Sequence, residues 1–173
     1  MLTNKIVRTV FIVLLLITNI GCDQMSKSIV RNALAENERI HLFDERIMLT
    51  RVENAGAFLS LGDSLSDEIK FLLLVIIPVI VLTMAVMFLL TRSDMPKSLF
   101  IGLAFVIGGG IGNIYDRFIY GSVTDFIHLD FYLFKTGIFN MADVSIMTGV
   151  FVVLISFMIK NTRNWETESD TLL

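Results

Sequence analysis

The chain has 173 residues, 54% of them hydrophobic and 18% charged, with a formal net charge of −3 at pH 7. A soluble domain is only about 45–50% apolar even when glycine is counted, so this composition excludes an ordinary soluble protein. The composition predicts an integral membrane protein.

Four apolar segments are long enough to cross a bilayer, which takes about 20 mostly apolar residues, with a range of roughly 17–25. The segments are residues 6–22, 71–90, 98–115 and 141–159. We therefore expect an all-α membrane protein with four transmembrane helices. Residues 1–173 are expected to form a single integral membrane domain.

The first segment has two interpretations. Its basic start, apolar core and terminal Cys22 resemble the cleaved signal of a lipoprotein precursor. Such signals have leucine and then a small residue where this chain has Asn19 and Ile20, so the match is poor. We expect a retained helix that continues past Cys22, with a cleaved signal as the alternative. Cys22 is the single cysteine of the chain and is expected to behave as a small hydrophobe.

Asp23 and Lys27 lie one turn apart if the first helix continues, and acid before base is the favourable order at this spacing. One interpretation is a surface ion pair that contributes about 0.2–0.5 kcal/mol. The other is that Asp23 supports a functional site.

Residues 30–65 are expected to form a small extracytoplasmic β-sheet and loop subdomain on the membrane surface. Residues 47–52 alternate partly and contain β-branched side chains, which indicates a strand. Asn54 and Gly56 follow in a turn, where such residue types adopt unusual backbone angles most easily. A second turn is expected at residues 61–63.

Two features of the later segments concern helix geometry. Pro78 lies inside the second segment and should kink it. Gly108 and Gly112 have the spacing that lets two membrane helices approach closely. Phosphate binding by these glycines is the weaker alternative, because the phosphate-loop motifs are absent and no strand precedes them.

Cations are concentrated at the N-terminus, in the loop after the second segment and in the tail. They are Lys5, Arg8, Arg92, Lys97, Lys160 and Arg163. Because such cations mark short cytoplasmic segments, both termini should be cytoplasmic. Asp125 and Asp143 then face the outside. The polar tail, residues 161–173, is expected to be disordered.

Asp125 and Asp143 lie where apolar segments meet water, and acidic side chains at the edge of a bilayer usually serve function. One loop joins the third and fourth segments, so we expect the two carboxyls to meet. Carboxyls at short range cannot both ionise cheaply and therefore share a proton. One then takes a proton from water while the other polarises a carbonyl, which predicts peptide hydrolysis.

Three alternatives remain for the polar residues of this region. Asp143 has the position of a helix-capping acid, worth about 0.3–1 kcal/mol. Asp116 and Arg117 form either a structural ion pair or part of the catalytic site. His128 with Asp125 and a further loop acid is a weak candidate for a metal site, and an interfacial polar residue is the preferred interpretation.

Five sequence blocks in this order resemble the lipoprotein signal peptidase (signal peptidase II) family. They are Asp23-Gln-x-x-Lys27, Asn54-x-Gly56-Ala57-Phe58, Gly109-x-x-Gly112-Asn113-x-x-Asp116-Arg117, Gly121-x-Val123-x-Asp125-Phe126 and Phe139-Asn140-x-Ala142-Asp143.

The resemblance implies a membrane aspartyl endopeptidase that cleaves the signal peptide from diacylglyceryl-modified prolipoproteins immediately before the lipidated cysteine. It implies that Asp125 and Asp143 are the catalytic pair. It also implies a set of residues that line or support the site: Asp23, Lys27, Asn54, Gly56, Asn113, Arg117 and Asn140. No metal or other cofactor is expected.

The resemblance further implies partners and a location. The partners are prolipoprotein substrates, membrane lipid and globomycin-type cyclic peptide inhibitors, with no nucleic acid. The location is the bacterial cytoplasmic (inner) membrane, with the active site at the outer face and a loop that includes Asn54 closing over substrate.

A proton-coupled transporter is the main alternative function, because membrane carboxylates also relay protons. Transporter acids are expected near the bilayer midplane in broken or repeated helices, whereas these acids cluster at one side. A binding or scaffold protein would not need paired acids at helix ends.

Overall fold

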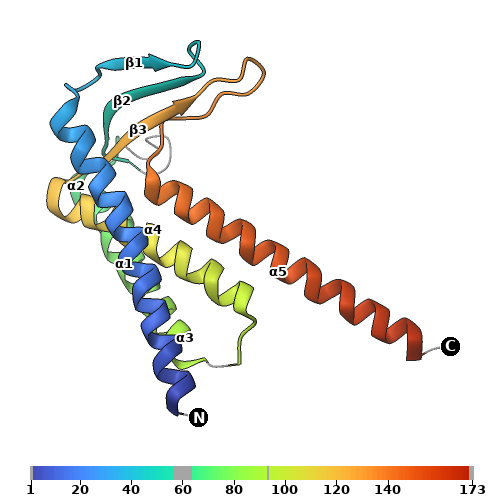
Figure 1. Ribbon diagram of the computed structural model, residues 1–173. Coiled ribbons are helices and arrows are strands. Elements are labelled where there is room, and N and C mark those ends of the chain that lie inside the picture. Colours follow the sequence, from blue (N-terminus) through green and yellow to red (C-terminus); the bar gives the residue numbers. More distant parts are fainter. Residues whose placement is uncertain (1, 57–63, 93, 172–173) are drawn as a thin grey trace.

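The computed structural model describes residues 2–56, 64–92 and 94–171, and describes side chains between residues 6 and 159 of these ranges. In chain order the elements are α1 (Leu2–Ala33), β1 (Arg39–Leu42), β2 (Ile47–Asn54), α2 (Asp67–Phe71), the π-helical turn η2 (Leu72–Ile76), α3 (Ile77–Thr91), α4 (Lys97–Tyr120), β3 (Val123–Leu129) and α5 (Met141–Thr171) (Figure 1). The motif residues Ala57 and Phe58 and the turn expected at residues 61–63 lie outside the described residues.

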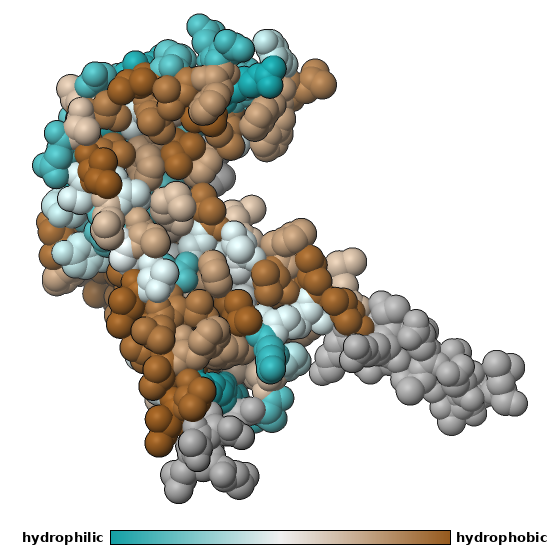
Figure 2. Space-filling model, in the orientation of Figure 1, coloured by the Kyte–Doolittle hydropathy of each residue, from teal (hydrophilic) through white to brown (hydrophobic). Residues whose placement is uncertain are grey.

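Four helical stretches are long and apolar enough to cross a membrane. They are Ile6–Ala33, Asp67–Thr91, Lys97–Tyr120 and Met141–Ile159. The predicted fold class, four membrane helices with a small sheet, is thereby confirmed. The outward-facing side chains of these helices are largely hydrophobic, as the brown surface of the helical region shows (Figure 2).

Several helices end later than their hydropathy predicted. The first continues past Cys22 to Ala33, as expected, and the third continues to Tyr120 beyond its apolar segment, which ends at residue 115. Charged side chains interrupt the apolar pattern there, but they are paired inside the protein, so the helices continue. The helix α5 extends to Thr171, so the disorder predicted for the tail is wrong up to that residue.

The second span is irregular next to its proline: a π-helical turn precedes Pro78, where a kink was predicted. Pro78 is in the first turn of α3, directly after the π-helical turn η2. Proline lacks an N–H, and its ring collides with the carbonyl four residues earlier, which here belongs to Leu74. A π turn at this place accommodates the proline within one continuous span.

The helix α4 is central and contacts α1, α3 and α5. Its glycines allow this, because a Cβ on Gly109 would collide with the carbonyl oxygen of Ala142 in α5. A Cβ on Gly112 would lie 2.5 Å from Asp23 Oδ2 in α1, and one on Gly108 would lie 2.8 Å from Asn19 Cβ. The predicted close packing at Gly108 and Gly112 is therefore correct, with α1 as the partner.

A three-stranded antiparallel sheet, ordered β1-β2-β3, lies across one end of the helices, which we call the sheet end (Figure 1). Its strands do not all come from residues 30–65, so the predicted extent of the subdomain is wrong. The third strand, Val123–Leu129, belongs to the connection between α4 and α5. Val123 to Phe126 are all buried, so β3 lacks the polar-apolar alternation by which strands are recognised.

The sheet is anchored on α1 by a small hydrophobic cluster, in which Val30 and Leu34 of α1 pack with Phe126 of β3. A bulge shifts the register between Leu49 and Val52, after which Val52 pairs with Asp125. This arrangement places Asp125 directly above the helix ends.

Candidate active site

Asp125 occupies the middle of β3 and is 5% exposed. Its Oδ2 accepts a hydrogen bond of 3.0 Å from Asn54 Nδ2, and its Oδ1 accepts one of 2.6 Å from Asn140 Nδ2. Both carboxylate oxygens are therefore held by side-chain amides, one from the neighbouring strand and one from the start of α5.

Asp143 lies in the first turn of α5 and is half-buried. Its backbone N–H donates to Asn140 Oδ1 over 3.0 Å, and its Oδ2 accepts from the Asn140 backbone N–H over 3.2 Å. This reciprocal pair is a helix capping box, so the capping interpretation of Asp143 is geometrically correct. The second oxygen, Oδ1, accepts from Asn113 Nδ2 over 2.9 Å.

Asn140 joins the two acids, because its side-chain amide binds Asp125 and its backbone N–H binds Asp143. The structure thus brings together the pair that the sequence predicted. The pKa of Asp125 is raised from 3.8 to about 6, chiefly because the residue is buried and also because of the nearby charge of Asp143, while the hydrogen bonds from Asn54 and Asn140 oppose the shift.

A second polar network is fully buried beside this pair. Lys27 Nζ lies 2.8 Å from Asp23 Oδ2 and 3.0 Å from Asp116 Oδ2, and all three side chains are at most 1% exposed. Asp116 Oδ1 also lies 3.1 Å from Arg31 NH2. The interpretation of Asp23 and Lys27 as a surface pair is therefore wrong.

The alternative of an ion pair between Asp116 and Arg117 is also wrong, because Asp116 pairs with other cations. Adjacent residues on a helix point in different directions, so Asp116 turns to Lys27 and Arg31 of α1. Arg117 instead donates from NH2 to the Gly56 carbonyl over 2.9 Å. Gly56 in turn donates its N–H to Asn54 Oδ1 over 3.1 Å, which aims the amide of Asn54 at Asp125.

Two contacts connect the buried network with the acid pair. Lys27 Nζ donates to Asn113 Oδ1 over 3.0 Å, so the amide nitrogen of Asn113 is turned toward Asp143. Asp23 Oδ1 accepts from the Ala142 backbone N–H over 2.9 Å, next to Asp143 in α5. Asp23 thus supports the start of α5, as the second interpretation of that residue required.

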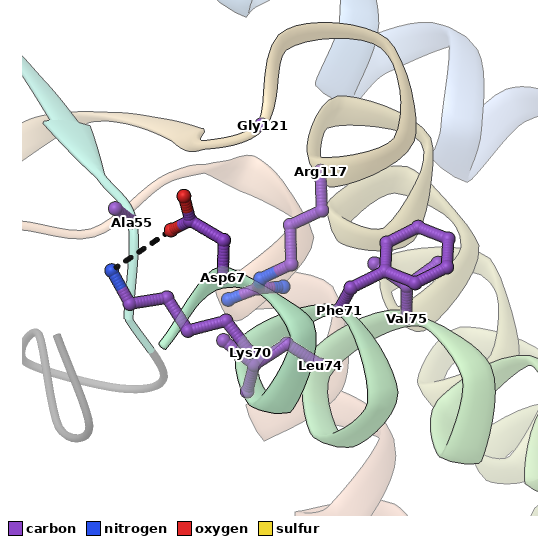
Figure 3. Close-up of a pocket in the computed structure, with 8 residues that line it drawn as sticks. All are labelled: Ala55, Asp67, Lys70, Phe71, Leu74, Val75, Arg117 and Gly121. Atoms are coloured by element: carbon purple, nitrogen blue, oxygen red, sulfur yellow. Dashed lines mark ion pairs between the residues drawn. The ribbon is translucent and has the colours of Figure 1, made fainter. Parts of the chain in front are cut away.

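A pocket of about 400 Å³ opens beside Arg117. It is lined by Ala55, Asp67, Lys70, Phe71, Leu74, Val75, Arg117 and Gly121. The Arg117 side chain points into it from α4, facing the first turns of the second span, where Lys70 and Asp67 form an ion pair of 3.9 Å (Figure 3). The Arg117 Nε is buried and has no hydrogen-bond partner among the described residues.

Two members of the buried network, Gln24 and Arg31, were not predicted as site residues. Gln24 Nε2 donates to Asp23 Oδ2 and to Asp116 Oδ1, each over 3.0 Å. Arg31 lies one turn beyond Lys27 on the same face of α1, a spacing that would have identified it. Within the described ranges, no group of three histidine, cysteine or acidic side chains is placed to hold a metal ion, which contradicts the His128 alternative.

The fold and the site define a multi-pass membrane protein with a hydrogen-bonded aspartate pair at one end of its helices. The family model for signal peptidase (SPase) II matches residues 12–159, and the chain belongs to this family. It is therefore an aspartic-type membrane peptidase, as the sequence predicted.

This chain is similar to curated proteins and to solved structures over most of the length of each. A lipoprotein signal peptidase of Wigglesworthia glossinidia brevipalpis is 35% identical over 155 residues, which are 88% of this chain and 91% of that protein. One from Streptococcus pneumoniae is 35% identical over 147 residues, 85% of this chain and 90% of that protein. A solved structure described as a bacterial membrane enzyme superposes with a TM-score of 0.76 at 26% identity, covering 89% of this chain and 90% of that one.

Proposed function

We propose that this peptidase removes the signal peptide from diacylglyceryl-modified prolipoproteins immediately before the lipidated cysteine, with Asp125 and Asp143 as its catalytic pair. Family membership supports the reaction. The observation that carries the residue assignment is the shared hydrogen-bonding of both acids to Asn140.

The balance of charges at the sheet end supports a single proton shared by Asp125 and Asp143. The buried network is neutral by itself, because two acids, Asp23 and Asp116, face two cations, Lys27 and Arg31. Lys27 is already counted in that network, although its charge also reaches Asp125. The one further cation is Arg117, whose charge interacts with both Asp125 and Asp143. One shared proton therefore neutralises the site.

In the proposed reaction the ionised acid takes a proton from a water molecule that lies between the two carboxyls. The protonated acid donates to the carbonyl oxygen of the scissile bond while that water attacks the carbonyl carbon. The C–N bond then breaks as the first acid passes the proton from water to the leaving amine, and the former carbonyl oxygen returns its proton to the second acid. We assign the proton to Asp125, because its burial raises its pKa to about 6. Arg117, with a free Nε, is suited to bind a substrate carbonyl.

Lipid-borne substrate can reach this pair sideways from the bilayer. The molecule is hollowed between the sheet and α5, and the walls of the hollow are mainly hydrophobic (Figure 2). We propose that the lipid chains of the substrate, and globomycin-type cyclic peptides, enter here. Competitive inhibition by globomycin would support entry of such peptides, and unchanged cleavage at saturating inhibitor would contradict it.

We also propose that both termini are cytoplasmic, that the membrane is the bacterial inner membrane and that the site lies at its outer face. Both termini lie away from the sheet end (Figure 1), and cations gather on their side. Labelling of a cysteine placed at Glu36 by a membrane-impermeant reagent in intact cells tests this, and protection of that cysteine would contradict it.

The experiment for the catalytic pair is cleavage of a diacylglyceryl-modified precursor by purified protein. Asp125→Asn and Asp143→Asn should each abolish turnover while leaving the thermal unfolding transition cooperative. Asp44→Asn, an exposed acid in the turn between β1 and β2, is the matched control and should retain full activity. Full turnover by either variant of the pair would remove that residue from the catalytic role.

A further inference from the structure

The connection between β3 and α5 forms a second hairpin, whose end is hydrophobic and exposed. The returning chain bridges β3 at Ile127–Phe139 and at Asp130–Lys135. Its end consists of Phe131, Tyr132, Leu133 and Phe134, which are 50%, 82%, 102% and 65% exposed. We call these four residues the apolar tip.

The apolar tip has a defined backbone. The Phe131 N–H donates to the Phe134 carbonyl over 2.9 Å, and the Tyr132 N–H donates to Asp130 Oδ1 over 3.1 Å. Tyr132 has a φ of +60°, a left-handed conformation that is uncommon for residues other than glycine. Hydrogen bonds thus hold a conformation in which neighbouring apolar side chains project outward.

An ion pair directly flanks the apolar tip. Asp130 and Lys135 form an ion pair of 2.6 Å across the two arms of the hairpin. The Asp130 N–H donates to the Arg46 carbonyl over 2.9 Å, which joins the hairpin to the turn between β1 and β2. The same turn contains Phe43, which is 75% exposed.

We propose that the apolar tip, with Phe43, enters the interfacial layer of the same bilayer that the four helices cross, at the sheet end. Aromatic and aliphatic side chains backed by charges have the pattern of an interfacial membrane anchor, with apolar groups among the lipids and charges at the headgroups. Tyrosine and phenylalanine here take the place of an aromatic belt.

The position of the hairpin agrees with this occupant. The sheet extends above the beginning of α5, and its free end shows hydrophobic and hydrophilic residues side by side (Figures 1 and 2). Few residues separate Phe134 from Met141, where the last span begins, so the tip lies within about 25 Å of that span even if the chain were fully extended. The apolar surface of the tip can therefore join the lipid-facing surface of the bundle.

This anchor is independent of the proposed chemistry and has a consequence for it. With Phe126 of β3 packed on α1 and the hairpin that follows β3 in the lipid interface, the sheet would cover the hollow. The site would then stay open toward the bilayer and covered toward water.

The experiment is electron paramagnetic resonance on the full chain in proteoliposomes, with a nitroxide on a single cysteine in a Cys22→Ser background. The tested variant is Leu133→Cys, whose side chain is fully exposed and whose replacement leaves no cavity. Met147→Cys, 67% exposed on the last span, is the lipid control, and Glu36→Cys, in the exposed loop after α1, is the water control.

The label at position 133 should be reached readily by oxygen and poorly by a water-soluble nickel chelate, as at position 147. Collision with the nickel chelate as frequent as at position 36 would overturn the proposal. Shielding at position 133 that disappears when the protein is diluted in lipid would assign the tip to a second copy of the chain instead. Shielding that persists on dilution confirms contact with lipid.

Discussion

Burial of Asp125 links the proposed chemistry to pH, because its pKa is raised from 3.8 to about 6. If this residue supplies the shared proton, kcat/KM should fall as pH rises through about 6, since that parameter follows the free enzyme. A pH profile of precursor cleavage checks this. A rate that keeps rising through this range would assign the proton elsewhere.

The same shift predicts an effect on stability. Folded Asp125 holds its proton to higher pH than the unfolded chain does, so its contribution to the free energy of unfolding is present below about 3.8 and is lost as pH rises through about 6. Thermal unfolding across this range should therefore show a smaller decline in Asp125→Asn than in the parent chain.

Asn140 has two separable roles, as a helix cap for α5 and as a donor to Asp125. Asn140→Ala should lower kcat roughly 10²-fold, the order expected when one donor of a catalytic site is removed. It should also destabilise the protein by about 1 kcal/mol through the lost cap. Asn140→Ser keeps a capping oxygen and should recover the melting temperature without recovering kcat. Recovery of kcat by serine would reduce Asn140 to a cap.

Buried ion pairs join the helices α1 and α4. Asp116 binds Lys27 and Arg31 of α1, and among the described residues it reaches β3 only through the Thr124 N–H at 3.5 Å. Asp116→Asn should therefore lower the free energy of unfolding by about 3 kcal/mol, the lower end for a broken buried pair. The kcat of the folded fraction should be retained.

The matched control for Asp116 is the exposed pair of Lys135, which is 62% exposed. Lys135→Gln should change the free energy of unfolding by less than about 1 kcal/mol. Chemical denaturation and cleavage kinetics measured on the same samples separate the two effects. A stable but inactive Asp116→Asn protein would move Asp116 into the catalytic machinery.

The contact between α4 and α5 sets the distance between Asn113 and Asp143. A Cβ on Gly109 meets the backbone of Ala142, which cannot move without shifting α5. Gly109→Ala should destabilise the protein by about 1–3 kcal/mol, as overpacking does, and lower kcat as well. At Gly21 of α1 no described atom lies within 4 Å of an added Cβ, so Gly21→Ala should be neutral or stabilising by about 0.5–1 kcal/mol. Melting temperatures and turnover of the two variants make the comparison.

At the scale of elements, the apolar helices were predictable and the sheet was only partly so. Each span is a long local run of apolar residues, which is visible without any knowledge of its neighbours. The strand β3 is buried on both faces and carries Asp125 among its apolar residues, so its sequence was interpreted as a connecting loop. Only its pairing with β2 makes it a strand.

At the scale of the whole molecule, one end of a membrane bundle concentrates nearly all the buried polar side chains. The acids, amides and cations there come from α1, β2, α4, β3 and the start of α5. Their mutual pairing allows charged residues to stay inside a protein whose other helical surface faces lipid. The same end carries the sheet and the proposed membrane-contacting tip.

Hydropathy and motifs are local properties of the chain, so they revealed the spans and the family and predicted Asp125 and Asp143 as the catalytic pair. The folded chain was needed to show which donor holds each carboxylate oxygen, that Asp116 pairs with α1, and that β3 completes the sheet. These contacts join residues that are distant in sequence, and geometry selects among several chemically equivalent partners. Asn140 shows the difference, since its motif predicted a place in the site but its position between the two acids follows from the fold.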